Sequence, residues 1–265
     1  DHLDLSHTIT QTIKYQYADG TTASQPHTAQ ITYTRTATND DVTGKVTYSD
    51  WTTANNDFPA VDSPTITGYT PSQSVVGPVQ VTPTSADQTT VVTYTADQET
   101  ATVTYVDDTT GKVLNKQTLI GAYGSKANYD IQGQIKNFEN HGYQLVSDDY
   151  PANGEVFNNP GHVNKYVVHL KHKVTSDSTT NNPDNVADLT KTVSETITYT
   201  YANGKTAAQS VTNKVTFTRT ATKDQVTGKV TYGAWTPAGN DDFPAVDSPT
   251  ITGYTPSVAQ VGAVN

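Results

Sequence analysis

Apolar and polar residues alternate along most of this sequence. Ile13, Tyr15 and Tyr17 lie on one side of an extended segment, and polar residues fill the positions between them. Successive side chains of a β-strand point to opposite faces of its sheet, so this spacing predicts a strand with one buried face. The same alternation is found in three further segments of the N-terminal part, at Ile31 and Tyr33, at Val46 and Tyr48, and at Val92 and Tyr94.

Turn residues separate these predicted strands. Asp19-Gly20 tolerates the positive φ angles of a tight hairpin, and a second turn is expected between Asp40 and Gly44. No convincing helix is found before residue 99. Prolines favour extended or turning chain in the second half of this part, at Pro59, Pro64, Pro71, Pro78 and Pro83.

The segment after residue 98 has a different pattern. Strands are predicted around Val103 and Tyr105 and over residues 112–120, and again over residues 143–146 and 165–173. Between the two pairs lies the one predicted helix, residues 129–140, which ends before Gly142, a residue typical of the position after a helix. Two strands, a helix and two strands is the order of a β-grasp domain, in which the helix covers one face of the sheet.

An internal repeat sets the domain organisation. The segment DLSHTITQTIKYQYADGTTA from Asp4 returns as DLTKTVSETITYTYANGKTA from Asp188, a separation of 184 residues. The repeat predicts two copies of one β-rich domain, at 1–98 and 188–265, around a β-grasp domain at 99–174 and a polar linker at 175–187. The second copy stops at Asn265, before the counterpart of the strand at Val92 and Tyr94. We therefore expect this copy to be truncated and to have an unpaired sheet edge.

Composition supports thin, strand-built cores. Only 34% of the 265 residues are hydrophobic, and 16 of the aromatic residues are Tyr against 5 Phe and 2 Trp. Thr is the commonest residue, and its β-branched, half-polar side chain suits the solvated face of a sheet. The fold class expected is mainly β or α+β, an elongated tandem of small β-rich domains with a ubiquitin-like β-grasp domain at the centre.

Charge and chain features exclude several classes of partner. The net charge of −10 disfavours binding to nucleic acid and to anionic membrane surfaces. No run of 18 apolar residues is found, the first ten residues do not resemble a signal peptide, and Met is absent even at position 1, so we expect an excised piece of a longer chain. Cys is absent, which excludes disulfides and thiolate chemistry.

No motif for catalysis or metal binding is found. The sequence contains no zinc-protease, serine-hydrolase, phosphate-loop or dinucleotide motif, and His169 and His172 are three apart on a predicted strand, so they point to opposite faces. We expect a protein that is not an enzyme and has no cofactor. Paired acidic residues in turns are expected to be solvated, at Asp40-Asp41, Asp107-Asp108, Asp148-Asp149 and Asp241-Asp242, and a structural Ca²⁺ ion at such a pair is one alternative. Lys to Asn isopeptide bonds are a second alternative, although no spacing singles out a pair.

Three tyrosines are candidates for ligand binding. Most tyrosines alternate with polar residues and are interpreted as core residues. Tyr123, Tyr129 and Tyr150 lie instead in turns or at the ends of predicted elements, where an aromatic ring could stack on a sugar. They are the candidate site residues of this sequence.

Two segments resemble a known family. The central segment, with TVTYVDDTTGKVLNKQTLIGAYGSKANYD and NFENHGYQLVSDDYPANGEVF, resembles the mucin-binding (MucBP-type) β-grasp domain. The repeated segments, with VTFTRTATKDQVTGKVTYGAW and SPTITGYTPS, resemble the β-rich domain that accompanies it in the Mub repeats of mucus-binding surface proteins of lactic-acid bacteria. The family repeat is usually written with the β-grasp domain first, so this chain straddles a repeat junction.

The resemblance implies an extracellular adhesin, anchored to the cell wall by signal and anchor segments outside this chain. It implies weak, multivalent binding to host mucin glycoproteins by a monomeric repeat. Two alternatives stay open. The β-grasp domain could bind immunoglobulins or other proteins through an edge strand, or the chain could be a passive stalk segment.

Overall fold

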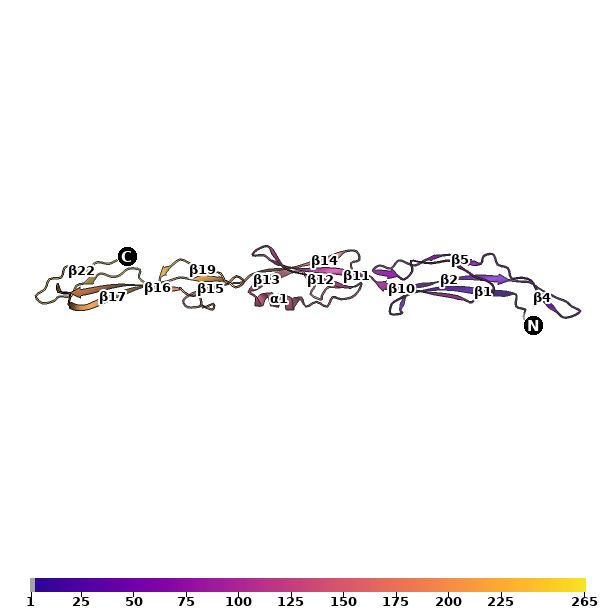
Figure 1. Cartoon of the computed structure of the whole chain (residues 1–265), viewed down its shortest axis with the longest axis horizontal. Coiled ribbons are helices and arrows are strands. Elements are labelled where there is room, and N and C mark those ends of the chain that lie inside the picture. Colours follow the sequence, from indigo (N-terminus) through magenta and orange to yellow (C-terminus); the bar gives the residue numbers. More distant parts are fainter. Residues whose placement is uncertain (1–2) are drawn as a thin grey trace. The chain divides into compact units, whose positions relative to one another are not determined.

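The computed structural model describes residues 3–265, and within that range the chain is mainly β with a single helix, α1 (Ile131–Asn140) (Figure 1). This confirms the fold class expected from the alternation. No helix among these residues is long and apolar enough to cross a membrane. The chain divides into two compact units, Asp1–Thr104, Asn115–Tyr129 and Asp149–Val167 in the first, and Tyr105–Leu114, Asp130–Asp148 and Val168–Asn265 in the second.

The first copy of the repeated domain is built on a four-stranded sheet. The strand order is β2-β1-β10-β7, with bounds β1 (Ser6–Tyr17), β2 (Thr22–Thr34), β7 (Tyr69–Pro71) and β10 (Gln88–Ala96). The predicted hairpin at Asp19-Gly20 joins β1 to β2 antiparallel, whereas β10 pairs parallel with β1. Ile9, Ile13 and Tyr15 of β1 are buried on one face, as their spacing predicts.

The proline-rich second half of this domain covers the buried face of the sheet. It contains the short antiparallel pairs β5 (Asp57–Phe58) with β9 (Val79–Gln80) and β6 (Val61–Asp62) with β8 (Val75–Val76). Two buried tyrosine hydroxyls connect the layers, because Tyr33 donates to the carbonyl of Val81 at 2.7 Å and Tyr94 to that of Pro64 at 2.5 Å. A separate hairpin, β3 (Ala37–Asn39) with β4 (Val46–Tyr48), follows β2.

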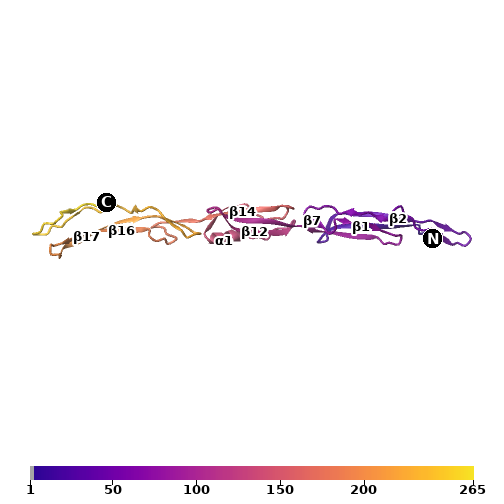
Figure 2. The same cartoon turned by 45° about the horizontal axis from the view of Figure 1, so that its top comes forward.

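The central segment has the strand and helix order predicted for a β-grasp domain (Figure 2). Its sheet has the order β12-β11-β14-β13, with bounds β11 (Gln98–Asp107), β12 (Lys112–Ala122), β13 (Tyr143–Asp148) and β14 (Val163–His172). The helix begins two residues later than predicted because Asp130 caps it, accepting the backbone N–H of Gly133 at 2.8 Å. Phe138 on the helix contacts the rings of Tyr105 and Tyr143.

The second copy of the repeated domain has the same hairpins. Its strands lie in three sheets. The first contains β16 (Thr190–Thr200), β17 (Thr206–Thr218) and β20 (Thr236–Pro237), and the second pairs β18 (Ala221–Asp224) and β19 (Val230–Tyr232) with β15 (Val174–Asp177), which precedes this copy. The third is β21 (Val246–Asp247) with β22 (Gln260–Val261). In the described part of the chain β16 is an edge strand, as expected. Ile197 and Tyr199 on it are half-buried, whereas their counterparts Ile13 and Tyr15 are buried next to β10.

The segment predicted as a linker is more ordered than its polar composition indicates. Residues 174–177 form strand β15, which pairs antiparallel with β18. Farther along, Asn182 exchanges two hydrogen bonds with the backbone of Val186, and Val186 packs with Leu189 and Ala221. The sequence prediction missed this order because it depends on partners that are far away in the sequence.

Substitution of Gly68 tests the packing between the first copy and the central domain. Its φ of +77° favours glycine, and a Cβ there would lie 2.3 Å from the ring of Tyr123. Gly20 has a similar φ of +86° but open space around it. We expect Gly20→Ala to lower the free energy of unfolding by about 1 kcal/mol through its backbone alone, and Gly68→Ala by about 2–4 kcal/mol because the ring must also move. Chemical denaturation of both variants measures this difference, and equal losses would contradict the packing at Tyr123.

Candidate functional site

The three candidate tyrosines lie at element ends, as predicted, but they contribute to packing. Tyr150 is only 7% exposed, and its ring centroid is 5.9 Å from that of Tyr129 and 5.2 Å from that of Tyr166. Tyr123 contacts the repeated domain instead, with its ring 5.7 Å from that of Tyr69. Tyr129 and Tyr150 are therefore brought together, and no sugar could stack on the enclosed ring of Tyr150 in this conformation. Their role in binding stays a prediction.

A buried carboxylate organises the region around Tyr150. Glu155 is 2% exposed and accepts hydrogen bonds from the side-chain amide of Asn164, at 2.8 Å, and from the hydroxyl of Tyr166. Burial, and next the hydrogen bond to Glu155, raise the pKa of Tyr166, so its hydroxyl remains a donor. A buried carboxylate without such donors would be strongly destabilising. This network therefore holds the chain around Tyr150 in place.

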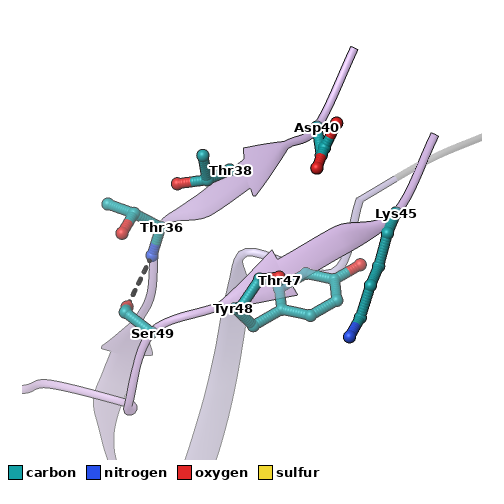
Figure 3. A pocket seen from close by; sticks show the side chains of 7 residues that line it. All are labelled: Thr36, Thr38, Asp40, Lys45, Thr47, Tyr48 and Ser49. Atoms are coloured by element: carbon teal, nitrogen blue, oxygen red, sulfur yellow. Dashed lines mark hydrogen bonds between the residues drawn. The ribbon is translucent and has the colours of Figure 1, made fainter. Parts of the chain in front are cut away.

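A shallow polar pocket lies on the β3–β4 hairpin of the first copy (Figure 3). Its volume is about 440 Å³, and its lining side chains come from both strands and the residues next to them: Thr36, Thr38, Asp40, Lys45, Thr47, Tyr48 and Ser49. The lining thus combines hydroxyls, a carboxylate, an ammonium group and one aromatic ring. Sugar hydroxyls both donate and accept hydrogen bonds, and these are the groups that would pair with them.

An arginine fixes the aromatic residue of this pocket. The guanidinium carbon of Arg35 lies 4.0 Å from the ring centroid of Tyr48 and 4.3 Å from that of Trp51. Arg35 also donates to the backbone carbonyl of Asp4 at 2.7 Å, which holds the guanidinium in position. The second copy repeats the arrangement, with Arg219 at 3.7 Å from Tyr232 and 4.4 Å from Trp235. Each copy therefore presents the same preorganised ring.

The second unit contains an ionic cluster centred on His172, the last residue of β14. The side chain of His172 is 6% exposed, and its Nδ1 lies 2.7 Å from Oδ2 of Asp224 while its Nε2 lies 3.1 Å from Oδ2 of Asp107. A neutral imidazole has only one N–H, so both contacts are hydrogen bonds only when the ring is protonated. Asp224 also accepts the backbone N–H groups of Val226 and Thr227.

Protonation states in this cluster follow from its geometry. The hydrogen bond to Asp224 raises the pKa of His172 above 6.5 against the opposing effect of burial. Burial acts to raise the pKa of Asp224, but the hydrogen bond from His172 and those from the backbone outweigh it and lower the pKa to about 2. For Asp107 burial is likewise outweighed, by hydrogen bonds from Thr110 and Thr109 and by His172, and the pKa is lowered. The cluster is therefore a cation held between two anions.

Sequence reasoning missed this cluster in two ways. It gave histidine no role, and it expected the acidic pairs to be solvated, which is wrong for Asp107 because that residue is buried. One signal was available: Val168, Leu170 and His172 share a face of the strand by their spacing of two, which places His172 on the core side. His169 points to the other face, as predicted, and pairs with Asp108 at 2.8 Å in a more exposed position.

No metal site can be named. Within residues 3–265 no three His, Asp or Glu side chains lie together in a way that could hold a metal ion. The exposed pairs Asp40-Asp41 and Asp241-Asp242 lie in or beside turns or bends, and Asp40 uses its carboxylate to accept the backbone N–H groups of Val42 and Thr43. That carboxylate therefore stabilises its own turn.

Two family models match this chain. The Muc B2-like domain matches residues 1–98 and 184–265, and the mucin binding domain matches residues 99–172. The chain belongs to the Muc B2-like family of Mub-type repeats. No curated protein matches the sequence.

The chain is similar to several solved structures. The crystal structure of Mub-RV is 41% identical, with a TM-score of 0.54 over 63% of this chain and 89% of that one. The type 2 repeat of the mucus binding protein MUB from Lactobacillus reuteri is 38% identical over 63% of this chain and 91% of its own, with a TM-score of 0.45. The MucBP domain of the adhesion protein from Pediococcus pentosaceus is 38% identical over 34% of this chain and 99% of its own, with a TM-score of 0.32.

The His172 cluster predicts a pH dependence for this Mub-type repeat. A histidine whose pKa is raised by folding stabilises the fold fully below its unfolded value and loses that contribution as pH rises through the folded value. A carboxylate whose pKa is lowered by folding has the opposite pH dependence. It stabilises the fold above its unfolded pKa of 3.8, and this contribution is lost as pH falls towards about 2, the folded pKa of Asp224. We therefore expect the thermal unfolding midpoint of the second unit to fall as pH rises above 6.5.

Two substitutions on the same strand test this prediction. His172→Gln should remove the fall above pH 6.5, whereas His169→Gln, which changes the more exposed pair with Asp108, should leave it unchanged. Calorimetry of the chain and both variants from pH 5 to 9 gives the three curves. A pH dependence that survives His172→Gln would contradict the assignment.

Proposed function

We propose that this chain is a mucus-binding segment of a cell-surface adhesin and that it contacts mucin glycans through weak, repeated, non-catalytic interactions. The observation that carries the proposal is the match of residues 99–172 to the mucin binding domain, between two Muc B2-like copies. The solved relative from Lactobacillus reuteri is itself described as a mucus binding protein. The proposal places this segment outside the cell, on a protein anchored to the cell wall, as the family resemblance implies.

The polar pocket of the first hairpin, with the corresponding residues of the second, is the glycan contact that the geometry favours. The pocket on the first copy is lined by Thr38, Lys45 and Thr47 together with Tyr48, whose ring is fixed by Arg35. In the second copy Thr222, Lys229 and Thr231 occupy the corresponding positions around Tyr232, and all four are exposed. Each chain thus presents these four side chains twice, although Gly233 replaces Ser49 and His172 binds Asp224 in the second copy.

Two shallow sites suit binding by avidity. An open pocket on a two-stranded hairpin removes little of a sugar from water, so each contact is weak. Linked sites raise the effective local concentration for the second contact, and retention on a glycan-covered surface then exceeds what one site gives. The negative charge of the chain, −10, leaves neutral sugar hydroxyls as better partners for these pockets than sulfated or sialylated groups.

Surface binding to purified mucin tests the proposal. Periodate oxidises vicinal diols of glycans and leaves the mucin polypeptide, so it should abolish retention of this chain if glycans are the ligand. A variant with four substitutions removes one hydroxyl and the amine from each hairpin: Thr38→Val and Lys45→Ala in the first copy, Thr222→Val and Lys229→Ala in the second. It should lower retention on mucin at least about tenfold, because both weak contacts are lost.

A matched control separates loss of contact from loss of folding. Thr8→Val with Thr32→Val removes an exposed hydroxyl pair, 2.9 Å apart, from β1 and β2 of the same domain, outside the residues that line the pocket. This variant should bind like the original chain, and circular dichroism should show all variants folded. Full retention by the four-substitution variant would place the mucin contact on another surface, and absence of binding by the original chain would leave a stalk segment as the better account.

Protein recognition is a second candidate, favoured by the edge of the central sheet. Strand β12 is at the end of the sheet order, and its residues 115–122 include Ile120, which is 67% exposed. An edge strand with an exposed apolar side chain can add a strand from another protein, which is one way an immunoglobulin could be bound. This contact would use the backbone and would be insensitive to periodate.

Immunoglobulin G on a parallel surface tests this second candidate. If β12 is used, Ile120→Lys should abolish the immunoglobulin signal, because a charge on the edge opposes strand addition, and should leave mucin binding unchanged. Lys116→Ala on the same strand alters a side chain that is already polar and exposed, and serves as the control. An immunoglobulin signal that survives Ile120→Lys would exclude this edge.

A further inference from the structure

The two repeated domains contain the same hairpin in two different environments. In the first copy β3 pairs with β4 in the register Ala37 to Tyr48, Thr38 to Thr47 and Asn39 to Val46. In the second copy β18 pairs with β19 in the corresponding register, Ala221 to Tyr232, Thr222 to Thr231 and Lys223 to Val230. The turns also match, because Asp40 and Asp224 each accept two backbone N–H groups, at 2.9 and 3.1 Å.

The hairpin of the second copy carries a partner. Strand β15, which directly follows the β-grasp domain, pairs antiparallel along the outer edge of β18 from Asp224 to Ala221. His172 reaches the free carboxylate oxygen of Asp224 at 2.7 Å, and the backbone N–H of Gln225 donates to the carbonyl of Lys173 at 2.9 Å. The end of a β-grasp domain therefore completes this hairpin into a three-stranded sheet.

The hairpin of the first copy has the matching surface uncovered. Among the described residues β3 and β4 form a two-stranded sheet, so the outer edge of β3 is unpaired. Val42, the counterpart of the half-buried Val226, is 94% exposed. Leu5 is 36% exposed, whereas its counterpart Leu189 is 6% exposed. The first copy thus exposes backbone donors and acceptors, apolar side chains and one carboxylate oxygen. In the second copy β15 pairs with the corresponding backbone groups, and His172 contacts the corresponding carboxylate oxygen.

We propose that the outer edge of β3, with Asp40, is a docking site for the C-terminal end of another β-grasp domain of this type. The occupant would add a short antiparallel strand to β3 and place a histidine on the free oxygen of Asp40. The complementarity is both geometric and electrostatic, since an imidazolium would meet a carboxylate whose other oxygen already accepts the turn amides. This inference does not depend on what ligand the chain binds.

Two differences between the hairpins specify the occupant further. In the second copy Lys223 lies 3.7 Å from Asp184, and Gln225 donates to the same carboxylate at 2.9 Å. The first copy has Asn39 and Asp41 at these positions. In an occupant, a carboxylate at the position of Asp184 would lie next to Asp41, which is also negatively charged. It would have no cationic partner, because Asn39 replaces Lys223. The fitting domain therefore carries a neutral or basic residue there.

The docking surface and the proposed glycan pocket share Asp40 but otherwise use different residues of one hairpin. In the second copy, where β15 occupies the edge, Thr222, Lys229 and Thr231 on the hairpin remain exposed. A docked neighbour would therefore bind Asp40 but leave the corresponding residues Thr38, Lys45 and Thr47 of the pocket accessible.

The test adds a candidate partner domain to the chain. A copy of residues 99–187 with Asp184→Asn is fused directly before Asp4, as the original segment precedes Asp188. Amide hydrogen exchange of the outer edge of β3 should slow at least about tenfold relative to the original chain, because those N–H groups become hydrogen-bonded. The ring of the added histidine, followed by NMR, should titrate above the ordinary value for histidine.

Variants of the fused protein decide whether the contact is the one proposed. Asp40→Asn keeps an acceptor for the turn amides but removes the charge, so it should return the added histidine to ordinary titration and reverse most of the protection. The fusion that retains Asp184 should protect β3 less than the one with Asn. Unchanged exchange at β3 in both fusions would overturn the proposal.

A second copy of the chain is the competing occupant. In that case the edge of β3 would become protected in the unfused chain as its concentration rises, with a matching increase in sedimentation rate. This result would overturn the proposal in favour of self-association, whereas concentration-independent exchange in the unfused chain supports the proposal.

Discussion

Main-chain pairing between strands is the interaction on which this structure depends most. Apolar residues are few, so each sheet buries a single row of side chains, such as Ile9, Ile13 and Tyr15 on β1. Many of those side chains are tyrosines, whose hydroxyls need acceptors once they are buried, and the carbonyls of Val81 and Pro64 provide two of them. A strand therefore stabilises the fold in two ways, through its own backbone hydrogen bonds and through the tyrosines that it covers. A side chain on an edge strand is consequently less buried than its counterpart inside a sheet, as the comparison of Ile197 with Ile13 shows.

The internal repeat shows which structural features depend on the surroundings, because it places nearly the same residues in two environments. Hairpin register and turn capping are the same in both copies, so these features depend on local sequence: Asp-x-x-x-Gly turns and alternating β-branched residues specify them without help. Burial differs, since Ala221 and Leu189 are buried where Ala37 and Leu5 are not. Local sequence thus determines the shape of each hairpin, and the adjoining strand determines which of its residues leave solvent.

The same division explains what could be predicted from the sequence. Strands, the hairpin at Asp19-Gly20, the helix and its end near Gly142 follow from periodicity and turn chemistry over a few residues. The parallel pairing of β10 with β1 could not be predicted, because it joins segments far apart in sequence and no alternation pattern specifies its direction. The candidate site was predicted less well: position in a turn suggested an exposed ring for Tyr150, but the neighbouring Tyr129 and Tyr166 enclose it. Asp107 looked solvated for the same reason, since its partner His172 is 65 residues away.

His172 shows why a chain with so small a core includes a buried charged group. Removing two carboxylates and an imidazolium from water opposes folding, and apolar side chains of the same volume could stabilise a junction as well. The ionic cluster differs from an apolar contact in specificity, because an imidazolium with two N–H groups is satisfied only when both acceptors are placed correctly. Asp107 lies on the β-grasp domain and Asp224 on the repeated domain, so satisfying both fixes how β15 enters the edge of β18. A short strand of four residues could otherwise pair in more than one register, since its backbone carries no sequence information. The charged cluster therefore selects the register that four backbone pairs alone would leave degenerate.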